Sequence, residues 1–128
     1  MKKKGTRAER ELFHILYDNG FMPCRIAGSG STPLPSVDLV VGNGKKHFAI
    51  ECKVIKSKVK YFHPDEIIQL EEFSTKFGAE PWIAIKFDYK GWFLLQPKTI
   101  ERTKNGYYSI SLELAKEKGL NLETFFKL

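Results

Sequence analysis

Two apolar, β-branched runs on either side of a Gly-Asn-Gly tripeptide (42–44) constrain this chain most strongly. "VDLVV" (37–41) precedes the tripeptide and "KKHFAIECKVI" (45–55) follows it. An Asn-Gly pair between two such runs is typical of a β-hairpin. The second run nevertheless carries Glu51 and Lys53 in its middle. Because burying an uncompensated charge is costly, these two residues need a partner or a function.

Alternation along the hairpin predicts where the charges lie. If the turn centres on the Asn-Gly pair, Asp38 lies opposite Ala49 and diagonal to Glu51. Period-two alternation then places Asp38, Glu51 and Lys53 on one face, beside the small Ala49. The opposite face is apolar and is expected to join the core, through Val37, Leu39, Val41, Phe48, Ile50, Cys52 and Val54.

The charged face is a candidate site for a hard metal ion. Two carboxylates at diagonal spacing repel each other unless a cation lies between them. Lys53 supplies one positive charge, and Mg²⁺ would neutralise more, since it prefers carboxylates, carbonyls and waters to His or Cys. The backbone carbonyl of Cys52 could be a further ligand. The alternative for Asp38, Glu51 and Lys53 is a solvated strand face with modest ion pairing.

Residues 6–19 predict an amphipathic helix, with Thr6 as its N-cap and Gly20 at its end. Its apolar stripe is Ala8, Leu12, Ile15 and Leu16. Glu9 has two interpretations. It can form a capping box with Thr6, or it can point from the edge of the stripe toward the carboxylates. Spacing alone leaves both open.

The remaining elements indicate an α/β domain with a mixed sheet, and the length favours a single domain over 1–128. Strands are expected over 21–28, 81–87 and 91–97, a loop over 28–36, a helix over 64–78 and a short helix with exposed aromatic residues over 121–128. The inward stripe of the second helix is predicted as Ile67, Leu70, Phe73 and Phe77. The segment 106–119 is ambiguous.

Charge and composition narrow the class of partner. The net charge of +6 and a pI near 9.3 favour nucleic acid. No apolar stretch is long enough for a membrane span, and the basic start lacks the apolar segment of a secretory signal, so a cytoplasmic protein without membrane partners is expected. Cys24 and Cys52 are interpreted as small buried hydrophobic residues.

Four separated motifs occur in one order: "KGTRAEREL", "CRIAGSGS", "VDLVVGNGKKHFAIECK" and "FSTKFGAEPWIAIKF". Together they resemble the archaeal-type Holliday junction resolvases of the PD-(D/E)xK nuclease superfamily. One departure is that no proline directly precedes Asp38, the nearest being Pro35. The resemblance weakens from about Arg102 onward. It implies a restriction-endonuclease-like fold, a central mixed β-sheet flanked by α-helices, in a single nuclease domain.

The resemblance also implies roles for site residues. Asp38 and Glu51 would hold Mg²⁺, for which Mn²⁺ is expected to substitute, and Glu9 would complete or orient the acidic site. Lys53 would be the catalytic lysine. Because neighbouring carboxylates should raise its pKa above ~10.4, we expect Lys53 to stabilise the transition state electrostatically rather than to accept a proton. Ser29 matches a catalytic loop serine, with Ser31 as a near-equal candidate.

Five basic residues are candidates for DNA contact. Arg10 and Arg25 match family arginines near the scissile phosphate. Lys56, Lys58 and Lys60 follow the candidate site along "KVIKSKVKYF", where phosphate contact and a solvated basic edge are the two interpretations.

The predicted function is a structure-selective DNA endonuclease that resolves four-way junctions by paired, metal-dependent phosphodiester hydrolysis in homologous recombination and repair. Paired nicks favour a homodimer, with segment 121–128 or strand 81–87 as its interface. Recombination or replication proteins are further candidate partners. The alternatives are a related nuclease that acts on flaps, mismatches or duplex DNA, and a non-catalytic DNA-binding module.

Overall fold

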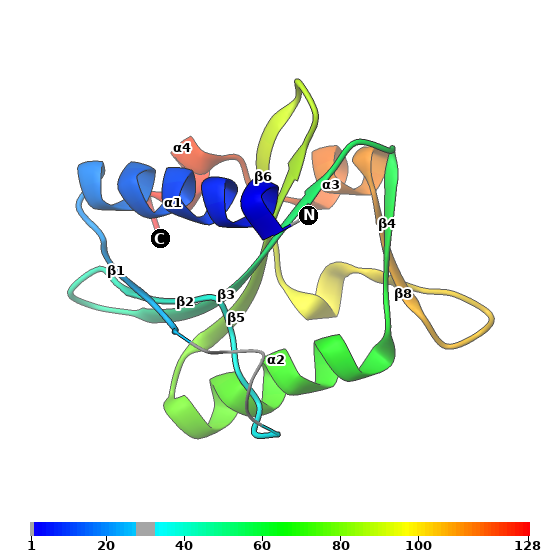
Figure 1. Cartoon of the computed structure of the whole chain (residues 1–128), viewed down its shortest axis with the longest axis horizontal. Coiled ribbons are helices and arrows are strands. Elements are labelled where there is room, and N and C mark those ends of the chain that lie inside the picture. Colours follow the sequence, from blue (N-terminus) through cyan, green and yellow to red (C-terminus); the bar gives the residue numbers. More distant parts are fainter. Residues whose placement is uncertain (1, 28–32) are drawn as a thin grey trace.

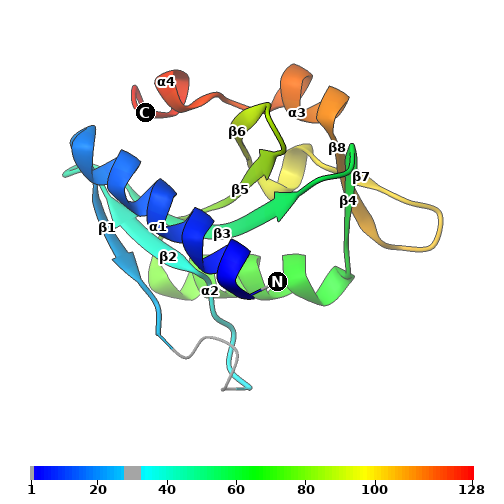
Figure 2. The ribbon, with the colours of Figure 1, turned by 45° about the horizontal axis from the view of Figure 1, so that its top comes forward.

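A five-stranded mixed sheet lies at the centre of the molecule (Figures 1 and 2). The computed structural model describes residues 2–27 and 33–128, with side chains from residue 6 onward. Neighbouring strands follow the order β1 (Met22–Arg25), β2 (Leu39–Gly42), β3 (His47–Ile55), β5 (Glu80–Phe87) and β6 (Gly91–Leu95). Strands β3 and β5 pair in parallel and the other neighbours pair antiparallel, which confirms the predicted mixed sheet.

Helices cover both faces of this sheet. Helix α1 (Lys2–Asp18) crosses one face and α2 (Pro64–Phe77) crosses the other (Figure 1). Helix α4 (Leu122–Phe125) joins the α1 side, whereas α3 (Leu112–Lys118) joins the α2 side. Two apolar cores result, one on each face of the sheet. Across the described part of the chain, no helix has both the length and the apolar character needed to cross a membrane.

The start of α1 differs from the prediction. The helix begins at Lys2, so Thr6 lies inside it and the predicted N-cap is wrong. Lysines are good helix formers, and the single Gly5 disfavours this turn without ending the helix. Its predicted end is confirmed, because Gly20 has a φ of 90° and the Phe21 N–H donates to the Leu16 carbonyl at 3.0 Å.

The hairpin forms, but its register is two residues away from the prediction. Asn43 begins the turn, and its Oδ1 accepts the N–H groups of Lys45 and Lys46 at 2.9 and 2.7 Å. This side-chain capping places Gly44, with a φ of 90°, after Asn43 in a longer loop. Val40 therefore lies opposite Ala49. A shift of two keeps every side chain of the paired strands on its predicted face.

A second, three-stranded sheet was not predicted. It consists of β4 (Val59–Phe62), β8 (Tyr108–Ser111) and β7 (Glu101–Arg102), in that order, and η1 (Pro97–Thr99) precedes β7. The ambiguous segment 106–119 thus divides into strand β8 and helix α3. The lysines in and before β4 hid this strand in the sequence, although its last residue, Phe62, is fully buried.

The predicted burial of several side chains is wrong, because tertiary packing decides which face of a helix is buried and whether a residue near the chain end is covered. Phe77 is 55% exposed, and Ser74 takes the buried position, with its hydroxyl donating to the Leu70 carbonyl. Phe125, expected to be exposed, is fully buried. Cys24 is exposed, since β1 is an edge strand.

Val37, just before β2, also lies on a different side of the sheet from the one predicted. Val37 lies before β2 and packs with the α2-side core instead of the α1-side core. Cys52 and Val54 are partly buried against the α1-side core, as expected.

Candidate active site

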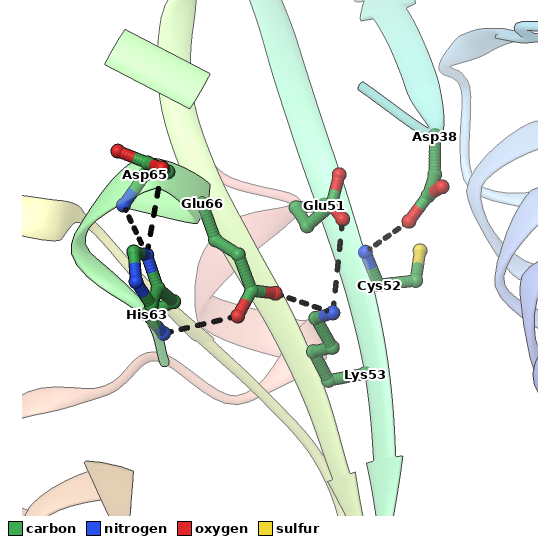
Figure 3. Close-up of polar contacts among 7 residues, drawn as sticks. All are labelled: Asp38, Glu51, Cys52, Lys53, His63, Asp65 and Glu66. Atoms are coloured by element: carbon green, nitrogen blue, oxygen red, sulfur yellow. Dashed lines mark hydrogen bonds and ion pairs between the residues drawn. The ribbon is translucent and has the colours of Figure 1, made fainter. Parts of the chain in front are cut away.

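Asp38 lies just before β2, at the end of the β2–β3 pairing, where Leu39 lies opposite Ile50. The Asp38 N–H also donates to the Ile50 carbonyl at 3.1 Å, so the pairing is irregular at this residue. The charge of Asp38 acts on Glu51, which places the two carboxylates near each other. The Asp38 Oδ2 accepts the Cys52 N–H at 2.8 Å, which fixes the carboxylate at the edge of β3 (Figure 3). Two carboxylates therefore meet where β2 begins.

The electrostatics of this pair favour a cation. Burial, reinforced by the neighbouring charge of Asp38, raises the pKa of Glu51 from 4.5 to about 8. Burial also raises the pKa of Asp38, although the Cys52 N–H and the charge of Lys53 oppose the shift. A carboxyl whose ionised form is so disfavoured binds either a proton or a positive ion.

Lys53 extends from β3 toward α2. Its Nζ lies 2.9 Å from the Glu66 Oε1 and 3.9 Å from the Glu51 Oε2 (Figure 3). The same ammonium lies 5.8 Å from the centroid of the Phe62 ring. Burial opposes the charged form, but the Glu66 hydrogen bond and the surrounding carboxylates outweigh it, so the pKa of Lys53 is raised. The expected direction of this shift is confirmed.

Glu66 is a site residue that the sequence interpretation missed. Its Oε2 accepts the His63 N–H at 3.1 Å, and the His63 Nδ1 accepts the Asp65 N–H at 3.2 Å, which together form a capping box at the start of α2. Burial raises the pKa of Glu66, but the Lys53 hydrogen bond and charge lower it overall. The spacing of Glu66 from His63 could have indicated the cap, but not the contact with Lys53.

Glu9 lies on the other side of the carboxylate pair. Its Oε1 is 3.5 Å from the Arg25 Nε, and the capping-box interpretation is wrong because Thr6 lies inside the helix. Burial and the charge of Asp38 raise the pKa of Glu9, against the effect of Arg25. Among the residues that the structure describes, no three His, Cys, Asp or Glu side chains form a group that could hold a metal ion.

The predicted DNA-contact residues occupy different surroundings. Arg10, Lys56 and Lys58 are exposed. Lys60 lies beside the site, because its Nζ is 5.8 Å from the centroid of the same Phe62 ring that Lys53 approaches. The loop serines Ser29 and Ser31 lie outside the described residues.

Comparison with known proteins decides the family. Residues 1–128 match the family model described as archaeal Holliday junction resolvase (Hjc). The chain belongs to this family. A crossover junction endodeoxyribonuclease Hjc from Archaeoglobus fulgidus is 41% identical over 125 residues, which are 93% of this chain and 92% of the relative. The Hje enzyme of Saccharolobus solfataricus is 38% identical over 76% of this chain and 74% of its own.

A solved structure of the same family has the same fold as this chain. The 1.6 Å structure of Archaeoglobus fulgidus Hjc, a Holliday junction resolvase from an archaeal hyperthermophile, superposes with a TM-score of 0.87 at 35% identity. The match covers 97% of this chain and 96% of that structure, and it therefore includes the C-terminal part that the sequence motifs left out.

Proposed function

We propose that this chain is a Mg²⁺-dependent endonuclease that resolves four-way DNA junctions by paired nicks, in homologous recombination and repair. The observation that carries the proposal is the pair of neighbouring, half-buried carboxylates, Asp38 and Glu51, with Lys53 beside them in a chain of the resolvase family. Its relatives are named crossover junction endodeoxyribonucleases.

The donor set fits Mg²⁺. This ion typically binds one or two carboxylates and completes its shell with waters and substrate phosphate, which Asp38 and Glu51 would permit. The raised pKa of Glu51, about 8, means that a cation at this position relieves an existing repulsion. The Cys52 carbonyl would add an oxygen, and Glu9 would orient the shell. When bound, the ion would acidify a water and neutralise phosphate charge.

Lys53 would act as a fixed positive charge. Its raised pKa keeps the ammonium protonated near neutral pH, so it is a poor proton acceptor. An ammonium there stabilises the charge that builds on the phosphate oxygens in the transition state. The pH–rate profile of Lys53→Arg tests this role. We expect Lys53→Arg to keep substantial activity. If the variant instead loses its activity, and the dependence of the rate on pH at the basic end disappears with it, Lys53 is the base.

Basic residues around the site would hold the DNA backbone. Lys60 lies beside Phe62, and its charge acts on Glu66, the partner of Lys53, so a phosphate next to the scissile one could bind there. Lys56 and Lys58, on the exposed segment between β3 and β4, would extend the contact. Arg10 and Arg25 would engage DNA from the side of α1. These charges compensate the acidic pair, which on its own would repel DNA.

A homodimer would supply the second nick. Both segments first suggested as its interface are used inside the monomer, since strand β5 is central and Phe125 is buried. Phe77 of α2, 55% exposed, lines a surface groove with Pro35 and Leu34, which is 69% exposed, and this groove favours the α2 side for a second copy. A shared α2 face would relate two sites by a two-fold axis, as a four-way junction requires.

The test compares cleavage of a synthetic four-way junction with cleavage of a linear duplex of the same sequence, with and without Mg²⁺. We expect paired symmetric nicks in the junction only when Mg²⁺ is present, and loss of cleavage with retained binding for Glu51→Gln. Equal cleavage of both substrates would instead favour a flap, mismatch or duplex nuclease. Junction binding without any cleavage by the unmodified chain would favour a DNA-binding module.

A further inference from the structure

The ammonium of Lys53 is held more closely by Glu66 than by Glu51. The distances are 2.9 Å to the Glu66 Oε1 and 3.9 Å to the Glu51 Oε2, and the first contact alone is a hydrogen bond. The lysine therefore reaches toward α2 while its ammonium stays within ion-pair distance of Glu51. Glu66 lies 13 positions further along the chain, at the start of a different element.

Both oxygens of the Glu66 carboxylate are occupied. One accepts from Lys53, and the other accepts the His63 backbone N–H at 3.1 Å. Ile67, the next residue in the helix, is buried against the sheet and anchors this turn of α2. A carboxylate held at both oxygens by a packed helix end is a rigid support for a lysine, whose four-carbon stem is otherwise flexible.

Helix capping alone does not account for this geometry. A capping box uses one oxygen of the residue at the third helical position, and Gln serves there as well as Glu. The second oxygen of Glu66 contributes nothing to the cap, yet it makes the short contact with Lys53. A glutamine has one acceptor oxygen where Glu66 uses two, so it cannot keep the His63 N–H and the Lys53 ammonium in their present positions at once.

We propose that Glu66 is a positioning residue, which fixes the Lys53 ammonium beside the carboxylate pair and prevents it from closing onto Glu51. This inference rests on the proposed function. Without Glu66, the nearest carboxylate available to Lys53 is that of Glu51. An ammonium bound there would occupy the position of the metal ion and would no longer face the scissile phosphate.

The experiment is a double-mutant cycle on junction cleavage under single-turnover conditions, with Lys53→Met, Glu66→Gln and both together. Glu71→Gln, an exposed carboxylate on the same helix, is the matched control. We expect Glu66→Gln to stay folded at the assay temperature, to keep the junction affinity of the unmodified chain, and to cleave about tenfold more slowly or worse, an effect of the size of one lost hydrogen bond to a charged group. In the Lys53→Met background, Glu66→Gln should cause no further loss.

A titration with Mg²⁺ supplies a second readout. Glu66→Gln should need a higher Mg²⁺ concentration for half-maximal cleavage, because Lys53 then competes with the ion for Glu51. An unchanged Mg²⁺ requirement, an unmodified rate in Glu66→Gln, or an equal loss in both Lys53 backgrounds would each overturn the positioning role. Should Glu66→Gln unfold, Glu66→Asp replaces it in the same cycle, since Asp keeps the charge but is too short to reach both donors.

The two proposals fail in different ways. If Lys53→Met cleaves junctions as fast as the unmodified chain, the proposed function of the site is wrong. If Lys53→Met is inactive while Glu66→Gln is fully active, only the role of Glu66 is wrong.

Discussion

Replacing Glu51 by Gln should reduce the pH dependence of stability of the metal-free protein. In the folded chain, burial and the charge of Asp38 raise the pKa of Glu51 from 4.5 to about 8. Between these two values the folded chain keeps a proton on Glu51 that the unfolded chain has released. Because the folded state binds more protons, the free energy of unfolding falls as the pH rises through this interval.

The size of the effect follows from the same two values. At about 1.4 kcal/mol per pH unit, the full interval corresponds to at most roughly 4 to 5 kcal/mol, and roughly 3 kcal/mol of it has been lost by pH 7. The Glu51 side chain is only 26% exposed, so solvent screens this penalty little. Glutamine has nearly the same shape and never ionises, so Glu51→Gln should be the more stable protein at neutral and basic pH.

Urea unfolding followed by circular dichroism, in the presence of a chelator between pH 5 and 9, measures this difference. Stability of the unmodified chain should decline toward pH 8, and the decline should be much smaller in Glu51→Gln. Parallel pH profiles for the two proteins would refute the conclusion that Glu51 is strained by burial and by Asp38. Adding Mg²⁺ at pH 8 should stabilise the unmodified chain and have little effect on Glu51→Gln.

Three further outcomes are expected. Phe77→Glu should convert a dimer to monomer in sedimentation analysis and change monomer stability by less than about 0.5 kcal/mol, since Phe77 is 55% exposed. Phe125→Ala should lower the free energy of unfolding by about 3–5 kcal/mol in urea titrations, because its fully buried ring packs on Phe21 and Phe48. Lys60→Met should weaken junction binding and reduce the salt slope of the affinity by about 1, measured by fluorescence anisotropy. The first expectation is contradicted if Phe77→Glu keeps the oligomeric state of the unmodified chain. The second is contradicted if Phe125→Ala loses less than about 1 kcal/mol of unfolding free energy, and the third if Lys60→Met leaves the salt slope unchanged.

Period-two alternation was enough to collect the charges of the hairpin on one face. Glu51 and Lys53 share a face and Asp38 lies close to both, although the predicted register was wrong by two residues. A shift by an even number of residues leaves each side chain on the same face of the sheet. The charged face could therefore be predicted although the turn was misplaced. The exact register, Val40 across from Ala49, depends on Asn43 capping the turn with its side chain, which the Gly-Asn-Gly pattern does not specify.

The errors in burial share one cause. A stripe of apolar residues predicts the buried face of a helix only when the helix packs on its partner with that stripe facing inward. In α2 the residue that faces the sheet is Ser74, and Phe77 is exposed. The C-terminal aromatic residue Phe125 was assigned to the surface because a short terminal helix has no visible partner in the sequence. In the structure, Phe21 and Phe48 supply that partner from elements about a hundred residues and eighty residues away in the chain.

By itself, the sequence determined the mixed α/β sheet, the face that carries the acidic residues and the direction of the Lys53 pKa shift. These follow from local alternation and from the charge of near neighbours, which act over a few residues. Only the tertiary structure decided that Glu66 holds Lys53 and that Glu9 joins Arg25 beside Asp38. Such contacts depend on where α1 and α2 settle on opposite faces of the sheet, which is set by the packing of two apolar cores and not by spacing along the chain.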